Sequence, residues 1–155
     1  IKENPRMHIP IIGNGDITSG EEARRRFEET GVDAVMVGRA TFGKPWIFAE
    51  INRALGKEPE FPLRGVIDSV HEPLSLDWKL DVLMNEVRQS VERNGSVGGL
   101  IHMRRHIAAS PLFKGIPDFR ATRIAMLRSE NIDEMLELME GTRPLLELGN
   151  ENIKP

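Results

Sequence analysis

The chain has 155 residues, of which 39% are hydrophobic and 29% charged, and its formal net charge is −3. This length corresponds to about one domain, and no apolar run reaches the roughly 18 residues that a membrane span needs. The absence of cysteine excludes disulfides, thiolate metal sites and cysteine nucleophiles within the chain. The first residues show no basic segment followed by an apolar one, so we expect no export signal and a cytoplasmic protein.

The first third of the chain predicts a strand, a helix, a second strand and a second helix. An apolar, β-branched run at 8–12 leads into a Gly-Asn-Gly-Asp turn, and a second apolar run at 34–37 ends at Gly38. Strands that alternate with helices over short connections are parallel and are joined by right-handed crossovers. Because both runs are continuously apolar, we expect both faces of the sheet to be covered.

Local signals fix the ends of the two predicted helices. Ser19 precedes a helix over about 20–30, with Glu22 as its capping-box partner and Gly31 as its C-terminal stop. Pro45 lies at the start of the second helix, which ends at Gly56.

The two strand-end loops form the candidate binding site of this region. Functional loops of parallel α/β folds lie at the carboxyl ends of the strands, and glycine there allows a ligand to approach the backbone closely. Asn14, Gly15 and Asp16 follow the first strand, and Gly38 and Arg39 follow the second. The residue types fit a phosphate cradle, and they equally fit ordinary turns with Asn and Asp in Asx conformations.

Two strands cannot close a barrel, since a complete TIM barrel takes roughly 250 residues. We therefore expect residues 1–56 to be the last two βα units of a larger α/β barrel. A proline-spaced connector follows, and residues 62–150 predict a small helical bundle, which makes the fold class α/β plus all-α.

The helical region combines one-sided apolar stripes with uneven charge. Helices are predicted over about 75–93, ended by Gly95, and over 97–109, with Asp118 and Asn131 capping two more. Residues 93–128 carry a net charge of +6, between flanks of −4 at 57–92 and −5 at 129–155. Such a stretch suggests a surface that faces a polyanion, although arginines paired with acidic neighbours would give the same pattern.

The histidines give no sign of a metal centre. Only His102 and His106 have i, i+4 spacing, and no glutamate lies between them as a zinc hydrolase motif requires. We expect no metal site in this chain.

Three blocks in the first third resemble the end of the barrel of bacterial tRNA-dihydrouridine synthases. They are the Asn-Gly-Asp-Ile block at 14–17, the Met-Val-Gly-Arg-Ala block at 36–40 and the Gly-Lys-Pro-Trp-Ile-Phe block at 43–48. Farther along, Met-Arg-Arg-His at 103–106 resembles the Arg-Lys/Arg-His element of the family's C-terminal domain.

The resemblance implies an oxidoreductase with an FMN-binding TIM barrel and a helical tRNA-binding domain. Such enzymes use NADPH to reduce FMN, reduce specific uridines of tRNA to 5,6-dihydrouridine, and protonate C5 from a barrel cysteine. The FMN phosphate would be held by Asn14, Gly15, Asp16, Gly38 and Arg39. The residues that match the RNA-facing segment are Arg104, Arg105, His106, Lys114 and Arg120.

The chain departs from the family pattern in two ways. It contains no cysteine, so no catalytic residue is assigned, and an N-terminal barrel half would be missing from it. We therefore expect the isolated chain to be inactive and to bind no FMN measurably. Family members often carry aromatic residues shortly after the Arg-Lys-His element, whereas Ala109, Ser110 and Pro111 follow it here.

Two other functions fit the sequence. One is another FMN-dependent TIM-barrel dehydrogenase, such as a dihydroorotate-type enzyme, which has no need of a basic helical domain. The other is a non-catalytic RNA-binding module built from the helices, which would bind RNA with strong salt dependence.

Overall fold

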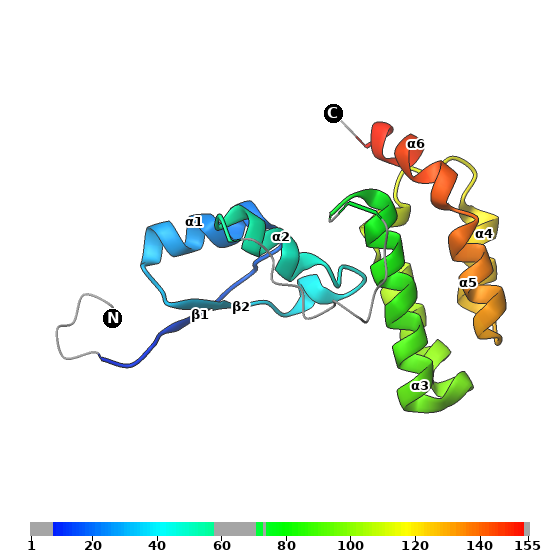
Figure 1. The fold of residues 1–155 in the computed structure, drawn as a ribbon, viewed down its shortest axis with the longest axis horizontal. Coiled ribbons are helices and arrows are strands. Elements are labelled where there is room, and N and C mark those ends of the chain that lie inside the picture. The colour runs from blue at the N-terminus through cyan, green and yellow to red at the C-terminus, as the bar shows by residue number, and fades with distance from the viewer. Residues whose placement is uncertain (1–7, 58–70, 73, 154–155) are drawn as a thin grey trace. The chain divides into compact units, whose positions relative to one another are not determined.

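A computed structural model describes residues 8–57, 71–72 and 74–153, and within these the chain divides into two compact units (Figure 1). The first unit contains 8–41 and 46–57, and the second contains 42–45 together with the described residues from 71 onward. The proline-spaced connector predicted after Gly56 lies outside the described residues.

The first unit is built on two parallel strands, β1 (Ile12–Asn14) and β2 (Ala34–Met36), with Ile12 opposite Ala34 and Asn14 opposite Met36. The parallel pairing was predicted, but β1 begins later than the predicted run at 8–12. Just before β1, the Ile11 N–H donates to the Asp33 carboxylate (2.7 Å) instead of a strand carbonyl, and the Ile11 carbonyl accepts from the N–H groups of Asp33 and Ala34.

Two α-helices, α1 (Gly20–Thr30) and α2 (Ile47–Ala54), complete this unit, and a short 3-10 helix, η1 (Arg39–Thr41), follows β2. The hydroxyl of Ser19 accepts from the Glu22 N–H (3.1 Å) and Gly31 ends α1 at φ 62°, as predicted. The carboxylate of Glu22 does not complete a capping box, because it pairs with Arg25 and Arg26 one turn later.

The helices pack on one face of the sheet only (Figure 1). The core of the unit consists of Ile17, Ala23, Ile47 and Ile51, with Val35, Val37 and Leu55 against it. On the other face, Ile12 and Met36 remain 64% and 55% exposed. The described residues therefore do not provide the cover on both faces that the apolar strands predict.

The second unit is helical. Its elements are α3 (Leu76–Ala109), η2 (Pro111–Phe113), α4 (Arg120–Arg128), α5 (Ile132–Glu140), η3 (Arg143–Leu145) and α6 (Leu146–Glu151). Its fully buried side chains include Leu80, Leu83, Val87, Leu100, Met103, Ile107, Met126, Met135, Met139 and Leu146. The methionines thus lie in the core, as their helical spacing indicates. None of the described helices is long and apolar enough to span a bilayer.

Gly95 divides α3 into the two helical segments that the sequence predicts. Its φ of 73° and ψ of 166° are not helical, and a positive φ is a conformation that glycine adopts at little cost. The second segment then returns along the first, and the Ser90 hydroxyl donates to the Gly99 carbonyl (3.1 Å) between them. A Cβ on Gly99 would lie 2.5 Å from the Val91 Cα, so glycine is what allows the two segments to approach this closely.

The two predicted helix caps later in the chain have different outcomes. The Asn131 side chain accepts from the N–H groups of Asp133 (2.7 Å) and Glu134 (3.4 Å), which confirms the cap of α5. The prediction that Asp118 caps α4 is wrong, since the helix begins one residue later, with Phe119 at the N-cap position. Asp118 instead has a φ of 50°, in the left-handed region that Asp tolerates better than most residues.

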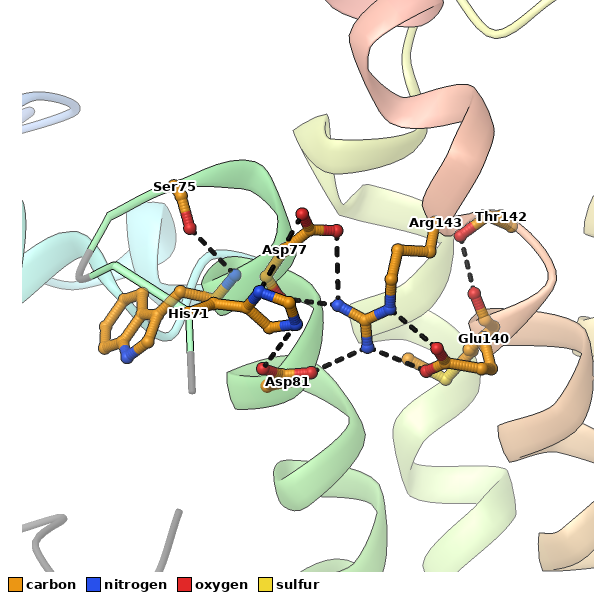
Figure 2. Close-up of polar contacts among 9 residues, drawn as sticks. His71, Ser75, Asp77, Asp81, Glu140, Thr142 and Arg143 are labelled. Carbon is orange, nitrogen blue, oxygen red and sulfur yellow. Dashed lines mark hydrogen bonds and ion pairs between the residues drawn. The ribbon is translucent and has the colours of Figure 1, made fainter. Parts of the chain in front are cut away.

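A cluster of charges fastens the start of α3 to η3 (Figure 2). The Arg143 guanidinium contacts Glu140 (2.6 Å), Asp81 (2.7 Å) and Asp77 (3.2 Å). His71 lies beside the same two aspartates, at 4.0 Å from Asp77 and 3.9 Å from Asp81. The hydrogen bond with Arg143 lowers the pKa of Glu140, and the same bond raises the pKa of Arg143.

Candidate functional site

The loops after β1 and β2 meet at the carboxyl edge of the two-stranded sheet. Because the strands are parallel and Asn14 pairs with Met36, both strands end at the same level of the sheet. The Arg39 guanidinium then contacts the Asp16 carboxylate at 2.5 Å. The structure thus brings together residues 14–16 and 38–39, which are more than 20 positions apart in sequence.

The glycines of these loops border open space. No heavy atom lies within 4 Å of a Cβ built on Gly15 or Gly38, so the fold itself does not require glycine at either position on steric grounds. The Gly38 carbonyl is directed into the turn, where it accepts from the backbone N–H (3.0 Å) and the hydroxyl (2.9 Å) of Thr41. This carbonyl is therefore already engaged within the turn.

A cavity of about 270 Å³ opens beside the first loop. Its lining consists of Gly13, Asn14, Gly15, Ile17, Arg26, Thr30, Val32 and Val35. It therefore includes two residues of the predicted cradle and omits Asp16, Gly38 and Arg39. Sequence analysis missed Arg26, because nothing in the spacing of α1 shows that this side chain lies near the Asn14 loop. The Arg26 Nε donates to Glu22 (2.8 Å).

The two charged side chains of the paired loops offset each other. Asp16 alone would repel a negative group, but the contact with Arg39 compensates its charge. Both side chains are largely exposed, so their pairing contributes little to stability. Within the part of the chain that the structure describes, no group of three or more His, Asp or Glu residues could hold a metal ion.

The second group of predicted residues lies on the helical unit, and its members differ in exposure. Arg105 is exposed, whereas Arg104 is half-buried, with Nη2 at 3.4 Å from the Ser129 carbonyl. His106 is only 8% exposed. Lys114, after η2, and Arg120, at the start of α4, are both exposed.

His106 faces a half-buried carboxyl group. Its Nδ1 lies 3.5 Å from the Glu86 Oε1, and neither ring nitrogen has a hydrogen-bond partner among the described residues. Burial raises the pKa of Glu86 and lowers the pKa of His106, and the nearby charges of His102 and Arg105 lower the latter further. Both shifts favour the neutral form of each group, which is the outcome expected for two ionisable side chains with little access to water.

One arginine of the basic stretch has a structural role that the sequence does not reveal. The Arg123 guanidinium donates to the Ala108 carbonyl, in the last turn of α3. Arginine side chains commonly satisfy the free carbonyl groups at helix C-termini. The +6 stretch therefore contains exposed cations, such as Arg105 and Arg120, and cations that hold helices together, such as Arg104 and Arg123.

Together these features define a class of protein with two parts. One is an α/β unit with paired loops at the carboxyl edge of a parallel sheet, and the other is an all-helical unit. The chain belongs to the dihydrouridine synthase (Dus) family, whose model matches residues 1–142.

Curated relatives resemble the chain over most of its length. It is 36% identical over 137 residues to tRNA-dihydrouridine synthase B of Salmonella typhimurium, covering 87% of this chain and 38% of the relative. It is 34% identical over 142 residues to tRNA-dihydrouridine synthase B of Proteus vulgaris, covering 90% and 39%. A probable tRNA-dihydrouridine synthase of Aquifex aeolicus is 30% identical over 141 residues, covering 90% and 39%. The chain thus spans less than two-fifths of the length of these relatives.

Proposed function

We propose that this chain is the C-terminal portion of an enzyme that reduces specific uridines of tRNA to 5,6-dihydrouridine, with FMN as cofactor and NADPH as reductant. The family match over residues 1–142 supports this function, as do the names of the relatives. The match also favours this function over a dihydroorotate-type dehydrogenase and over an RNA-binding module without activity.

The loops after β1 and β2 are proposed to hold the phosphate of FMN. The observation that carries this proposal is the 2.5 Å contact between Asp16 and Arg39, which joins the two loops. In this contact the guanidinium of Arg39 offsets the negative charge of the Asp16 carboxylate. The open space at Gly15 and Gly38 also fits, because a phosphate oxygen can approach the backbone where a side chain would otherwise stand. Asn14 offers an amide donor at the same edge.

The two strands are proposed to be the last two of a TIM barrel. Their uncovered face supports this proposal, since Ile12 and Met36 are more exposed than large apolar side chains of a finished sheet. An N-terminal barrel half would cover that face and supply the remaining strands. The protein's location in the cytoplasm belongs to the same proposal.

Bound FMN, once reduced, supplies a hydride for the uridine ring. The residues of this chain would bind the anionic tail of the cofactor and hold the RNA. Because the chain has no cysteine, the general acid implied by the family resemblance would come from outside it. We propose that Arg105, Lys114 and Arg120 contact RNA phosphates, since all three cations are exposed on the helical unit. For Arg104 and His106, burial makes an indirect role through neighbouring side chains the better proposal.

The experiment that tests this function uses the full-length protein that contains this chain. It is incubated with NADPH and tRNA that lacks dihydrouridine, and the RNA is digested and analysed by mass spectrometry. We expect uridine at defined positions to gain two hydrogen atoms, with consumption of NADPH. Consumption of NADPH with orotate or a related small substrate, and none with tRNA, would refute the proposal.

A further inference from the structure

The segment 42–45 belongs to the helical unit, although it lies between η1 and α2 in sequence. The centre of the Phe42 ring lies 5.4 Å from the centre of the His106 ring, in an edge-to-face arrangement at 75°. The guanidinium of Arg105 lies over the Phe42 ring, 5.1 Å from its centre. Phe42 nevertheless remains 42% exposed. An arginine cation thus lies over a partly exposed aromatic ring next to α3.

Close packing of the neighbouring Gly43 against α3 positions Phe42 beside Arg105. Gly43 has a φ of 66°, and a Cβ there would collide with the His106 carbonyl and the Ser110 backbone. The segment can therefore lie against α3 only with glycine at this position. His106, almost fully buried, contacts the Phe42 ring in the edge-to-face arrangement, and its own ring centre lies 5.2 Å from that of His102. Phe42 and Arg105 are consequently more fixed in place than two side chains on an open surface.

The chemistry of the pair suits an unpaired nucleobase. Bases stack on aromatic rings and on the planar guanidinium of arginine, and such stacking tolerates any base. The surrounding stretch at 93–128 has a net charge of +6, which attracts a polyanion and argues against a cationic or apolar partner. Ala109, Ser110 and Pro111, at the end of α3, offer no aromatic ring. Phe42 supplies an aromatic ring from a different part of the chain.

We propose that Phe42 and Arg105 form a stacking platform for one unpaired base of the bound RNA, with Gly43 and His106 as its positioning residues. The proposal rests on the proposed function, because it names a contact of the helical unit with the RNA substrate. Arg105 contributes charge and a flat surface, and Phe42 contributes a flat surface alone. Substitution of Arg105 should therefore change the salt dependence of RNA binding, whereas substitution of Phe42 should change only the contribution of the base.

The test measures binding of the 155-residue chain to two probes, an oligouridylate of roughly twelve nucleotides and a ribose–phosphate chain of the same length without bases. Phe42→Leu removes the aromatic ring while it keeps an apolar side chain. We expect about a tenfold loss of affinity for the oligouridylate, which is the typical value of one stacked base, and almost none for the abasic probe. The dependence on salt should not change, because no charge is removed.

Phe48→Leu is the matched control, since Phe48 is also an exposed phenylalanine (52%) but lies on α2 in the first unit. It should bind both probes as the unchanged chain does. Phe42→Trp should restore or exceed the original affinity for the oligouridylate, and an unchanged circular dichroism melt excludes a folding defect in each variant.

Two results would overturn the platform. If the unchanged chain binds the oligouridylate with the usual salt dependence and Phe42→Leu binds equally well, the platform is wrong and the proposed function is unaffected. If the unchanged chain binds neither the oligouridylate nor intact tRNA at low salt, the platform is wrong and the proposed RNA-binding role of the helical unit is wrong with it.

Discussion

Replacing Gly38 by valine separates a cofactor role from a structural one. No heavy atom lies within 4 Å of the Cβ position, and the φ of Gly38 is not left-handed. A side chain there meets only solvent in this chain, so the free energy of unfolding should change by less than about 0.5 kcal/mol. In the full-length enzyme, a branched side chain would separate a phosphate from the backbone of the Gly38 loop.

The size of the effect follows from the hydrogen bonds at risk. A hydrogen bond to a charged group contributes about 1.5–3 kcal/mol. Loss of one such bond corresponds to about a tenfold to hundredfold weaker affinity for FMN. The measurement is flavin titration of the apo form of the full-length enzyme, followed by fluorescence, together with thermal denaturation of both the enzyme and the 155-residue chain.

Gly20→Val is the matched control for this experiment. A Cβ on Gly20 would lie 2.6 Å from the Glu50 carbonyl oxygen and 2.8 Å from the Ala54 Cβ, so this variant should lose about 3 kcal/mol of stability through overpacking between α1 and α2. Unchanged FMN affinity in Gly38→Val would refute the assignment of this loop to the phosphate. A large loss of stability in Gly38→Val would show instead that Gly38 has a structural role.

The remaining predictions concern the helical unit. Arg143→Met should lower the free energy of unfolding by about 2 kcal/mol, because the guanidinium is largely buried and its loss leaves three carboxylates close together. Glu86→Gln should have little effect on stability near pH 4 and should stabilise the chain at pH 7. Burial raises the pKa of Glu86 above its ordinary 4.5, so the native state holds the proton more tightly and stability falls as pH rises through that window. Arg105→Ala should weaken RNA binding and reduce its salt dependence by about one ion, since the side chain is exposed. Arg104→Ala should act mainly on stability, because this side chain is half-buried against the end of α4.

Chemical denaturation and RNA titrations distinguish these outcomes from their alternatives. Arg25→Met, which removes a cation from exposed pairs within α1, should leave the stability almost unchanged, and an equally small effect of Arg143→Met would refute the special role of the Arg143 cluster. A Glu86→Gln variant that is less stable at pH 7 would mean that the carboxylate forms an ion pair with His106. Equal loss of RNA affinity in the Arg104 and Arg105 variants would contradict their different exposures.

Sequence reasoning succeeded where the cause is local. Ser19, Gly31 and Asn131 mark helix ends because each satisfies backbone groups a few residues away. Gly95 divides two helical segments because its own backbone angles are not helical. Asp118 shows the limit of this approach. Aspartate favours helix caps, but here it adopts a left-handed conformation one position before the N-cap of α4.

The sequence also determined the family, because three motif blocks in a fixed order and one farther element identify it without knowledge of any contact. It predicted the loop residues that meet at the sheet edge, since parallel strands must end on the same side. It did not reveal that Arg143 joins Asp77 and Asp81, more than 60 positions away, that His106 is buried, or that Phe42 lies beneath Arg105. These features depend on how distant segments pack. A residue's chemical type states what it can contact, and only the folded chain decides which partner comes within reach.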